Sequence, residues 1–508
     1  MLLLAGCTVG PDYKAPDINM PQAFSAAASL LDQLSAPTPA VAVPEKSKTS
    51  NTNAVALARW WRALDDPELD ALVEQAVAGN LDVKIALARL QEARTEEQVA
   101  MGMALPAASV AGAAARGTGS DVTRGRVPST LTSADSTAGL KQINEIAGFE
   151  AGWEIDLFGK YRREIEAAGD ETEAAKAARN AVLVAVIGDV VRAYVDLRGL
   201  QTRLAILRRN IDVQAHEYDV VETRYNRGLT NELDVTLAQR QLSSLKATVA
   251  PLVAQIDAAQ YAIAVLLGRM PEDLARELGK PQLLPGLPGR IAPGLPLDLL
   301  RRRPDISEQE RELAAATARI GVATANLFPH LSLTGAVGEQ GQGLGVSPNL
   351  VSSIWSAGPS LYWDVLDFGT LDALVNIADL QTQEQASVYR QTILNAVREV
   401  DGDIADFTAQ QDRLRELSKA LTASQRAVTL AQERYDRGLT DFLNVLDAER
   451  QEYGLEDEYA EAQQTAADDF AALYKALGGG WENYQAIPPI RKPEPAIVAA
   501  FRRLFDRP

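Results

Sequence analysis

An internal duplication limits the possible folds of this 508-residue chain more than any other feature. The segment that begins at Arg224 reads Arg-Tyr-Asn-Arg-Gly-Leu-Thr-Asn-Glu-Leu-Asp-Val-Thr-Leu-Ala-Gln-Arg-Gln. The segment that begins at Arg434 is identical to it at 11 of 18 positions, at an offset of 210 residues. Self-similarity of this kind predicts two structurally equivalent halves.

Each copy of the repeated segment predicts a tight turn between two helices. Gly228 and Gly438 suit the left-handed backbone conformation that ends a helix. Residues 230–231 (Thr-Asn) and 440–441 (Thr-Asp) supply side-chain oxygens that can cap the helix that follows. Taken locally, these signals would also fit a plain helical hairpin.

Long helices are predicted on both sides of each turn. Residues 160–226 contain no proline and would span about 100 Å as one helix. The returning segments carry heptad-like apolar stripes, from Leu242 to Leu266 and from Leu455 to Leu477. Pro251 is expected to bend the first of them. Helices of this length cannot fold back into a compact domain, so we expect them to pack side by side as coiled coils.

Four strands are predicted where the apolar pattern changes from a helical period to a period of two. They cover about 106–116, 147–158, 329–340 and 354–367, roughly the length that crosses an outer membrane. Trp153 and Trp363 fit an interfacial aromatic belt. A half-buried soluble sheet would show the same alternation. The Ser-, Thr- and Gly-rich segment from roughly Gly117 to Glu145 is expected to be a long external loop.

The bulk composition excludes several classes of protein. A net charge of −18 argues against nucleic-acid binding. No apolar run reaches 18 residues, so no transmembrane helix is expected. Cys7 is the only cysteine, which excludes internal disulfides and cysteine-based metal sites. The two histidines, His216 and His330, are far apart, and each is expected to be a surface or packing residue. We expect no cofactor and no metal.

The N-terminus carries a candidate lipidation site. Residues 4–7 (Leu-Ala-Gly-Cys) resemble a bacterial lipobox, in which Cys7 would be lipidated. Only six residues precede Cys7 and none is basic, so residues 1–7 are interpreted as a truncated signal peptide. A buried structural cysteine is the alternative. Thr8 in the next position is compatible with sorting to the outer membrane.

The expected organisation follows the duplication along the chain. An extended Pro-, Ala- and Ser-rich arm precedes the folded part, and irregular Pro- and Gly-rich stretches follow each repeat. The expected segments are an arm at 8–57, a first repeat at 58–278, an equatorial connector at 279–301, a second repeat at 302–478 and an equatorial tail at 479–508.

Four strands per chain require association with other copies if they cross a membrane. About eight strands are the fewest that close a barrel. Open sheet edges are not tolerated in lipid. The two helical hairpins would likewise form an arc and not a tube. The sequence therefore predicts a ring of protomers in which a strand barrel continues into a helical barrel.

Several motifs together resemble the TolC family, and within it the NodT-type outer-membrane lipoproteins of tripartite efflux systems. They are the duplicated turns, the lipobox followed by Gly10-Pro-Asp-Tyr13, Trp60-Trp61, Arg303-Pro-Asp-Ile306 and Phe328-Pro329. The resemblance covers nearly the whole chain. It implies an α+β fold, a homotrimer with a 12-stranded barrel, a long periplasmic α-helical tunnel, a periplasmic adaptor protein and an inner-membrane pump, expected to be of the RND type.

The resemblance also implies where the tunnel would be controlled. The constriction would lie at Leu443, Asn444 and Asp447, with Tyr435 and Asp234 near the tip. Leu443 and Asp447 are four residues apart and so share a helix face, where three copies would give an apolar ring beside a carboxylate ring. A solvated surface Asp447 is the alternative. The adaptor would dock on the turns, at Arg227, Gly228, Leu229, Thr230, Arg437, Gly438, Leu439 and Thr440.

The function implied is that of a passive exit duct for drugs or other small molecules. Type I protein secretion and heavy-metal export are alternatives within the same class. A coiled-coil stalk lipoprotein or adhesin would explain the helices, but not the four strands or the duplication. An enzyme is not expected, because the sequence offers no nucleophile–histidine pairing, phosphate loop or metal cluster.

Overall fold

The computed structural model describes residues 8–17, 25, 57–118, 141–274, 277–282, 284–287, 302–344 and 350–487. The chain forms two compact units, each of which contains parts of both repeats. The first, here called the strand unit, comprises Met1–Asp17, Arg89–Lys176 and Glu308–Gln391. The second, here called the hairpin unit, comprises Ile18–Ala88, Ala177–Ser307 and Thr392–Pro508. Cys7 and most of the expected arm, connector and tail lie outside the described residues.

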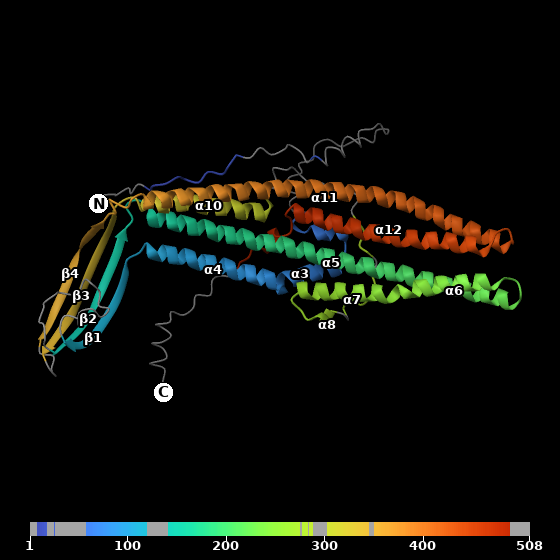
Figure 1. Ribbon diagram of the computed structural model, residues 1–508, viewed down its shortest axis with the longest axis horizontal. Coiled ribbons are helices and arrows are strands. Elements are labelled where there is room, and N and C mark those ends of the chain that lie inside the picture. The colour runs from blue at the N-terminus through green and yellow to red at the C-terminus, as the bar shows by residue number, and fades with distance from the viewer. Residues whose placement is uncertain are drawn as a thin grey trace. The chain divides into compact units, whose positions relative to one another are not determined.

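The strand unit contains one antiparallel sheet of four strands, in the order β1-β2-β3-β4 (Figure 1). The strands are β1 (Ala107–Thr118), β2 (Lys141–Ile155), β3 (His330–Leu344) and β4 (Leu350–Tyr362). The central β2–β3 pair joins the two repeats, with Phe149 opposite Val337. Within the described residues, β1 and β4 have no strand on their outer edges. The predicted α+β class and the four strands per chain are therefore confirmed.

The bounds of all four strands differ from the predicted ones. β1, β2 and β3 contain 12, 15 and 15 residues and so are longer than expected, whereas β4 contains 13 residues and begins and ends earlier than expected. The expected loop from Gly117 to Glu145 is shortened at both ends, because β1 continues to Thr118 and β2 already begins at Lys141. Trp363 lies just beyond β4 and not within it.

Trp153 and Trp363 nevertheless have equivalent roles. The indole Nε1 of Trp153 donates a hydrogen bond to the carbonyl of Ala104 (3.0 Å), just after α4 (Leu81–Met103). The indole Nε1 of Trp363 donates to the carbonyl of Leu327 (3.0 Å), just after α10 (Pro304–Ala325). Each indole thus satisfies a carbonyl that the end of a helix leaves without an internal partner.

His330, expected to be a surface or packing residue, has a specific polar contact. Its Nδ1 lies 2.8 Å from a carboxylate oxygen of Glu154. The hydroxyl of Tyr161 donates to the other oxygen of the same carboxylate (2.9 Å). His216 is exposed on α5.

The two longest helices are α5 (Lys160–Asn226) and α11 (Thr370–Asp436), each of 67 residues. The helix expected over residues 160–226 is present with those bounds. Gly159 (φ 86°) and Gly369 (φ 85°) precede the two helices in the left-handed region. A side chain at Gly159 would also collide with Thr8, since an added Cβ would come within 2.7 Å of its Cγ2. A glycine is therefore required at that position.

The returning helices differ between the repeats. In the second repeat α12 (Phe442–Ala476) is continuous, whereas the first repeat has α6 (Glu232–Ala247) and α7 (Val249–Leu266). Pro251 explains the interruption, because it lacks the N–H that would bond to the carbonyl of Ala247. The sequence predicted a bend at Pro251, and the structure has an interruption of the helix at Thr248, three residues before it.

One described stretch has the length and hydropathy of a transmembrane helix, although the sequence predicted none. Among the described residues, the stretch Glu232–Leu266 is long and apolar enough to cross a membrane, with a mean hydropathy of 1.5 and 22% of that window buried. Length and composition alone are weak support for a membrane span. Ile256 and Ile263 of this stretch are buried in the main core of the hairpin unit.

That core gathers around two adjacent tryptophans. Trp60 and Trp61 lie in a short 3-10 helix, η1 (Trp60–Leu64), just before α3 (Pro67–Gly79). The ring of Trp60 stacks on Tyr474 of α12 at a centroid distance of 5.4 Å and meets Phe470 edge-on at 6.0 Å. These ring contacts fix the start of the first repeat to the end of the second.

Two further short elements among the described residues are α8 (Pro271–Leu274) and η4 (Glu482–Tyr484).

Candidate functional site

The two duplicated turns have nearly the same backbone geometry. Gly228 and Gly438 have φ values of 73° and 70°, which confirms the left-handed conformation expected there. In the first turn, the N–H of Leu229 donates to the carbonyl of Arg224 (2.9 Å) and the N–H of Gly228 to that of Tyr225 (2.8 Å). The second turn repeats both bonds through Leu439, Arg434, Gly438 and Tyr435. This pair of bonds is the Schellman motif that closes a helix C-terminus.

The helix caps after the turns differ between the copies. Asn231 caps α6, since its side chain accepts a hydrogen bond from the N–H of Asp234 (3.0 Å). The Thr230 hydroxyl donates to the carboxylate of Asp234. The structure thus places Asp234 in the capping arrangement of the first turn.

In the second turn the expected side-chain cap is absent. Asp441 occupies the cap position of α12 in an extended conformation, but its side chain accepts no capping bond. The Thr440 hydroxyl instead accepts a hydrogen bond from the side-chain amide of Asn444 (2.8 Å). Asn444 is therefore tied to the turn.

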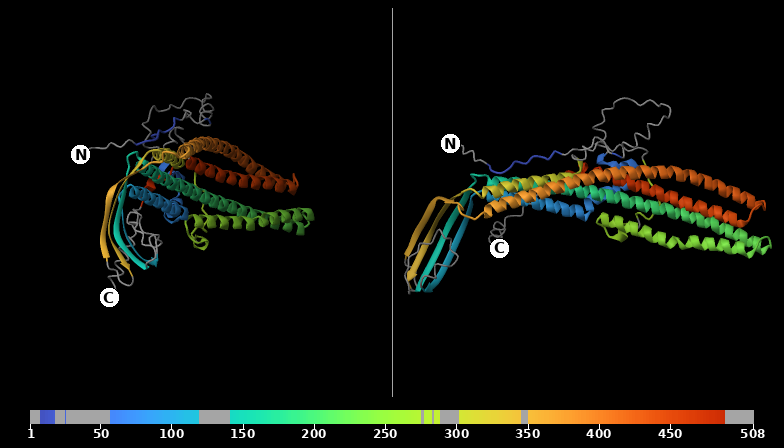
Figure 2. Two further views of the ribbon diagram at one scale, coloured as in Figure 1. Left: turned by 60° about the vertical axis from the view of Figure 1, so that its left-hand side comes forward. Right: turned by 45° about the horizontal axis from the view of Figure 1, so that its top comes forward.

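A small apolar cluster, here called the tip cluster, joins the two hairpins behind the turns. Figure 2 shows the backbone of these hairpins, α5 with α6 in green and α11 with α12 in orange to red. It consists of Val221, Ala238, Phe442, Val445 and Leu446. Tyr435 packs against it, with its ring 5.4 Å from that of Phe442. The guanidinium of Arg224 lies over the Tyr435 ring at 4.8 Å. Tyr435 therefore links α11 to both α12 and α5.

The residues expected at the constriction lie on the opposite side of α12 from the tip cluster. Leu443 is 57% exposed, although it is a large apolar residue next to a tight turn. Asp447 lies one helical turn further on and is also exposed, 2.9 Å from Arg450. An ion pair this exposed contributes little to stability. The structure thus presents Leu443 and Asp447 on one free face.

The turns themselves present exposed apolar side chains. Leu229 is 65% exposed and Leu439 is 63% exposed. Arg227 and Arg437 are exposed beside them. Each of the two turns therefore presents one exposed leucine and one exposed arginine.

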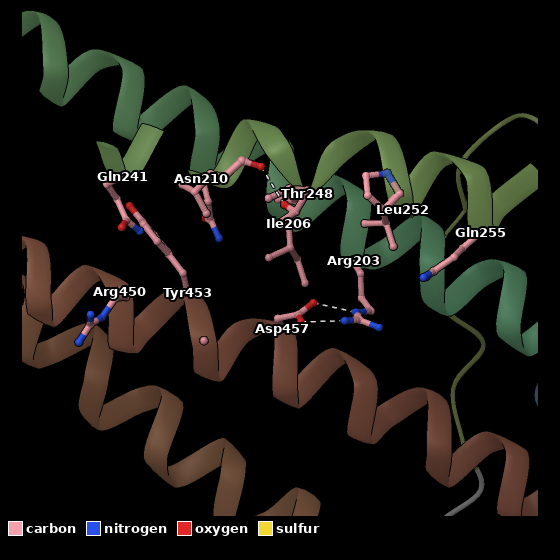
Figure 3. A pocket seen from close by; sticks show the side chains of 14 residues that line it. Arg203, Ile206, Asn210, Gln241, Thr248, Leu252, Gln255, Arg450, Tyr453 and Asp457 are labelled. Carbon is pink, nitrogen blue, oxygen red and sulfur yellow. Dashed lines mark hydrogen bonds and ion pairs between the residues drawn. The ribbon is translucent and has the colours of Figure 1, made fainter. Parts of the chain in front are cut away.

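A cavity of about 410 Å³ lies between α5, the break between α6 and α7, and α12 (Figure 3). Leu245 and Leu252 are among its apolar lining residues. On one wall Arg203 donates two hydrogen bonds, of 2.7 and 2.8 Å, to the carboxylate of Asp457. Sequence reasoning missed this interhelical pair, because its members are 254 residues apart.

In the strand unit, the segment that follows Cys7 is held in a specific docking site on α5. The side chain of Arg163 is only 4% exposed. It donates to the carbonyls of Val9 (3.2 Å) and Gly10 (3.3 Å) and to the carboxylate of Asp12 (2.7 Å). The N–H of Val9 donates to the carbonyl of Phe158 (3.1 Å). The start of the arm is thus fastened beside the end of β2.

Two further contacts hold the same segment on α10. The backbone of Gly10 approaches that of Gly321 so closely that an added Cβ on Gly10 would lie 2.4 Å from the Cα of Gly321. The guanidinium of Arg311 lies over the ring of Tyr13 at 5.5 Å. The Gly10-Pro-Asp-Tyr13 motif identified the segment, whereas nothing in the sequence pointed to Arg163 or Arg311 as its partners.

Replacing Arg163 with alanine is expected to release the arm. The change removes three hydrogen bonds from a charged donor to the arm, each worth roughly 1.5–3 kcal/mol. Cleavage by trypsin after Lys14 should become at least about tenfold faster, since cleavage follows the population of the released state. Lys176→Ala is the control, because Lys176 pairs with Glu173 on the surface of α5 and has no contact with the arm among the described residues. Equal cleavage rates for the Arg163 variant and the unaltered protein would contradict this role.

One face of the sheet carries a row of exposed apolar side chains. Val110, Phe149, Val337 and Trp355 are paired in register across β1, β2, β3 and β4. Their exposed fractions are 79%, 48%, 58% and 78%. A continuous apolar row across every strand is the pattern of a surface that faces lipid.

Comparisons with known proteins agree with this architecture. The profile of the family described as "Outer membrane efflux protein" matches residues 72–269 and 295–479. The chain is 31% identical over 482 residues to nodulation protein T of Rhizobium leguminosarum bv. trifolii, covering 94% of this chain and 96% of that protein. It is 29% identical to the solvent efflux pump outer membrane protein SrpC of Pseudomonas putida, covering 95% of this chain and 97% of that protein.

Solved structures show the same fold. The structure of the outer-membrane channel OprN superposes with a TM-score of 0.78 at 35% sequence identity, covering 94% of this chain and all of that one. The Campylobacter jejuni CmeC outer membrane channel has a TM-score of 0.78 at 21% identity, a level that bears on the fold alone.

Proposed function

The chain belongs to the outer membrane efflux protein family, and we propose that three copies of it form a closed duct through which small molecules leave the cell. As a member of this family it is an outer-membrane channel of an efflux pump, and its family is one of transport ducts and not of enzymes.

The open-edged sheet is the observation that carries the proposed trimer. Four strands with two free edges and an apolar face cannot remain in a membrane as a monomer, because unpaired backbone groups are not tolerated in lipid. Edge-to-edge association of β4 with β1 of the next copy would satisfy both edges. Three copies give 12 strands, which is above the minimum of about eight for closure.

The helices are proposed to continue this duct into the periplasm. Two hairpins per chain, joined through the tip cluster, form part of a wall, and three copies would complete it. Leu443, Asn444 and Asp447 would then form the constriction, since Leu443 and Asp447 share an exposed face. Tyr435 and Asp234 support this constriction from within, through the tip cluster and the turn cap.

The paired turns are proposed to bind a periplasmic adaptor protein that connects the duct to an inner-membrane pump of the RND type. Residues 227–230 and 437–440 present the same Arg-Gly-Leu-Thr sequence twice per protomer, hence six times per trimer, with the arginine, glycine and leucine exposed and the threonine half-buried. Exposed leucines next to arginines suit an interface with an apolar centre and a polar rim.

Replacing both turn leucines with glutamate is expected to weaken adaptor binding. A charge introduced at an apolar contact should raise the Kd by about tenfold or more, the range typical of interface hot spots. Leu229→Glu/Leu439→Glu would be compared with the unaltered protein by surface plasmon resonance against the adaptor. Gln425→Glu adds a charge on an exposed site of α11 and is the control. Unchanged binding by the double variant would place the docking surface elsewhere.

Lipidation of Cys7 is proposed on the basis of its neighbours. Val9, two residues later, is fastened beside the end of β2. A lipid on Cys7 would therefore start close to the sheet, where acyl chains could enter the membrane. Mass spectrometry of the N-terminal peptide tests this directly.

Small apolar or amphipathic molecules are the proposed cargo. Relatives are described as components of a solvent efflux pump, a toluene efflux pump and an antibiotic efflux pump, all in Pseudomonas putida. These names favour small molecules over secreted proteins. Cargo selection is expected to reside mainly in the inner-membrane pump.

One experiment tests the central proposal. The mass of the detergent-solubilised protein would be measured by light scattering, together with ion conductance in a planar bilayer. A conducting trimer is the expected result. A monomer that is extracted without detergent would contradict the barrel and favour a coiled-coil lipoprotein.

A further inference from the structure

The interface between α5 and α12, here called the seam, joins the hairpin of the first repeat to that of the second. The two helices run antiparallel and are linked by polar pairs along their length. Lys475 pairs with Asp189 at 2.9 Å, and the side-chain amide of Gln464 donates to Asp196 at 2.6 Å. Nearer the turns Arg203 pairs with Asp457, as Figure 3 shows, and Arg209 pairs with Glu456 at 2.6 Å.

Within this seam Glu449 of α12 is buried against another carboxyl group. Its exposed fraction is 3%, and it hydrogen-bonds to Glu217 of α5. The remaining carboxylate oxygen, Oε2, has no hydrogen-bond partner among the described residues. A buried carboxylate that is neither paired with a cation nor fully hydrogen-bonded is costly when ionised.

Among the described residues that line the cavity beside Glu449, none carries a positive charge that is not already paired. Glu217 and Glu449 line a cavity of about 440 Å³ with Tyr453. Arg209 is the single cationic residue among the described residues that line it, and it already pairs with Glu456. The other acidic residues of the lining are Glu433 and Asp436 from α11, and Glu452 from α12.

This environment favours the protonated form of Glu449. Burial makes the largest contribution to raising the pKa of Glu449. The hydrogen bond to Glu217 and the negative charge of Glu217 raise this pKa further. A proton shared between two carboxyl groups in contact removes their repulsion and supplies a hydrogen bond.

A second carboxyl pair lies further along the same seam. Asp468 of α12 hydrogen-bonds to Asp196 of α5, and one of its oxygens, Oδ1, is buried without a hydrogen-bond partner among the described residues. Burial, followed by the charge of Asp196, raises the pKa of Asp468 to about 8. Asp469 also raises it and Arg192 opposes the shift.

We propose that the Glu217–Glu449 and Asp196–Asp468 pairs each hold one proton across the seam, and that loss of these protons separates the two hairpins and favours an open tip. The proposal rests on the proposed gate at the tip. The channel would thereby respond to pH, closing more tightly as the pH falls.

The direction of the pH dependence follows from the raised pKa values of Glu449 and Asp468. A carboxyl group with a raised pKa binds its proton more strongly in the closed, folded arrangement than when exposed. The stabilisation is complete below the ordinary carboxyl pKa of about 4 and is lost as pH rises through the raised value. For Asp468 this window extends from about 4 to about 8.

Single-channel recording of the full-length protein at pH 5.5, 7.0 and 8.5 tests the proposal. The open-to-closed ratio should rise with pH by up to about tenfold per unit for each proton released. Glu449→Gln keeps a hydrogen-bond donor toward Glu217 but cannot ionise, and should remove part of this dependence. Glu449→Gln/Asp468→Asn should remove nearly all of it. Glu433→Gln, an exposed acid on the same cavity, is the matched control and should titrate like the unaltered protein.

A second measurement separates this inference from the proposed function. The melting temperature of the helical signal of the detergent-solubilised protein should fall between pH 5.5 and 8.5, and the double variant should show a smaller fall. A double variant that titrates like the unaltered protein in both measurements would overturn the shared protons. If no variant conducts at any pH, the channel proposal fails, whereas the melting data still decide the protonation.

Discussion

The Leu443→Ala/Asp447→Ala variant is expected to conduct ions several-fold better at rest than the unaltered protein. Both side chains project from the same face of α12, and neither is buried in the hairpin unit. In a trimer, three leucines and three carboxylates would narrow the tip, and truncation to alanine would remove most of both rings. Stability should change little, because the core side of the helix is untouched.

Single-channel conductance in a planar bilayer measures this effect. Leu430→Ala/Glu433→Ala is a matched control, since it removes a partly exposed leucine and an exposed acid from α11. The control should conduct like the unaltered protein. If the Leu443/Asp447 variant also does so, these residues do not form the constriction.

The largest loss of stability is expected from Arg198→Ala. The side chain of Arg198 is fully buried in the hairpin unit. It donates to Glu68 of α3 (2.5 Å), to Gln201 (2.6 Å) and to the carbonyl of Lys280 (3.0 Å). Removal leaves Glu68 without its cation and an empty space in the core, so the free energy of unfolding should fall by about 3–5 kcal/mol.

Urea unfolding of the detergent-solubilised protein, followed by tryptophan fluorescence, tests this expectation. Trp60 and Trp61 lie in the same apolar core as Tyr194, and the guanidinium of Arg198 lies over the ring of Tyr194. Their fluorescence therefore reports on the unfolding of this core. Arg208→Ala, an exposed change on α5, should alter the free energy by no more than about 0.5 kcal/mol. A loss for Arg198→Ala as small as that of the control would show that the buried pair contributes little.

Local chemistry allowed several features to be predicted closely. The turn glycines were identifiable because only glycine readily adopts a positive φ at a helix C-terminus. A distortion near Pro251 was predictable, because proline removes one specific helical hydrogen bond, and the helix is interrupted at Thr248. The helix over residues 160–226 was predictable because this segment contains no proline. These are properties of a residue and its neighbours in sequence.

The predictions that were wrong concern features that depend on a contact with another residue of the folded chain. The ends of β1 and β2 extend further than the apolar alternation because each backbone continues to pair with its neighbour. Asp441 has the chemistry of a cap, yet Thr440 and Asn444 bond to each other beside it. Trp363 lies outside β4, where its indole is bonded to the end of a helix.

The sequence by itself determined the duplication, the type of each long element and the positions of the turns, because these depend on periodicity and on single residues with special backbone requirements. The tertiary structure alone decided which elements meet. It paired β2 with β3, distributed both repeats over two units, docked the arm on Arg163 and buried Glu449 against Glu217. A periodic pattern defines which face of a helix or strand is apolar, but it carries no information on the register or partner of that face, and those contacts join residues far apart in the chain.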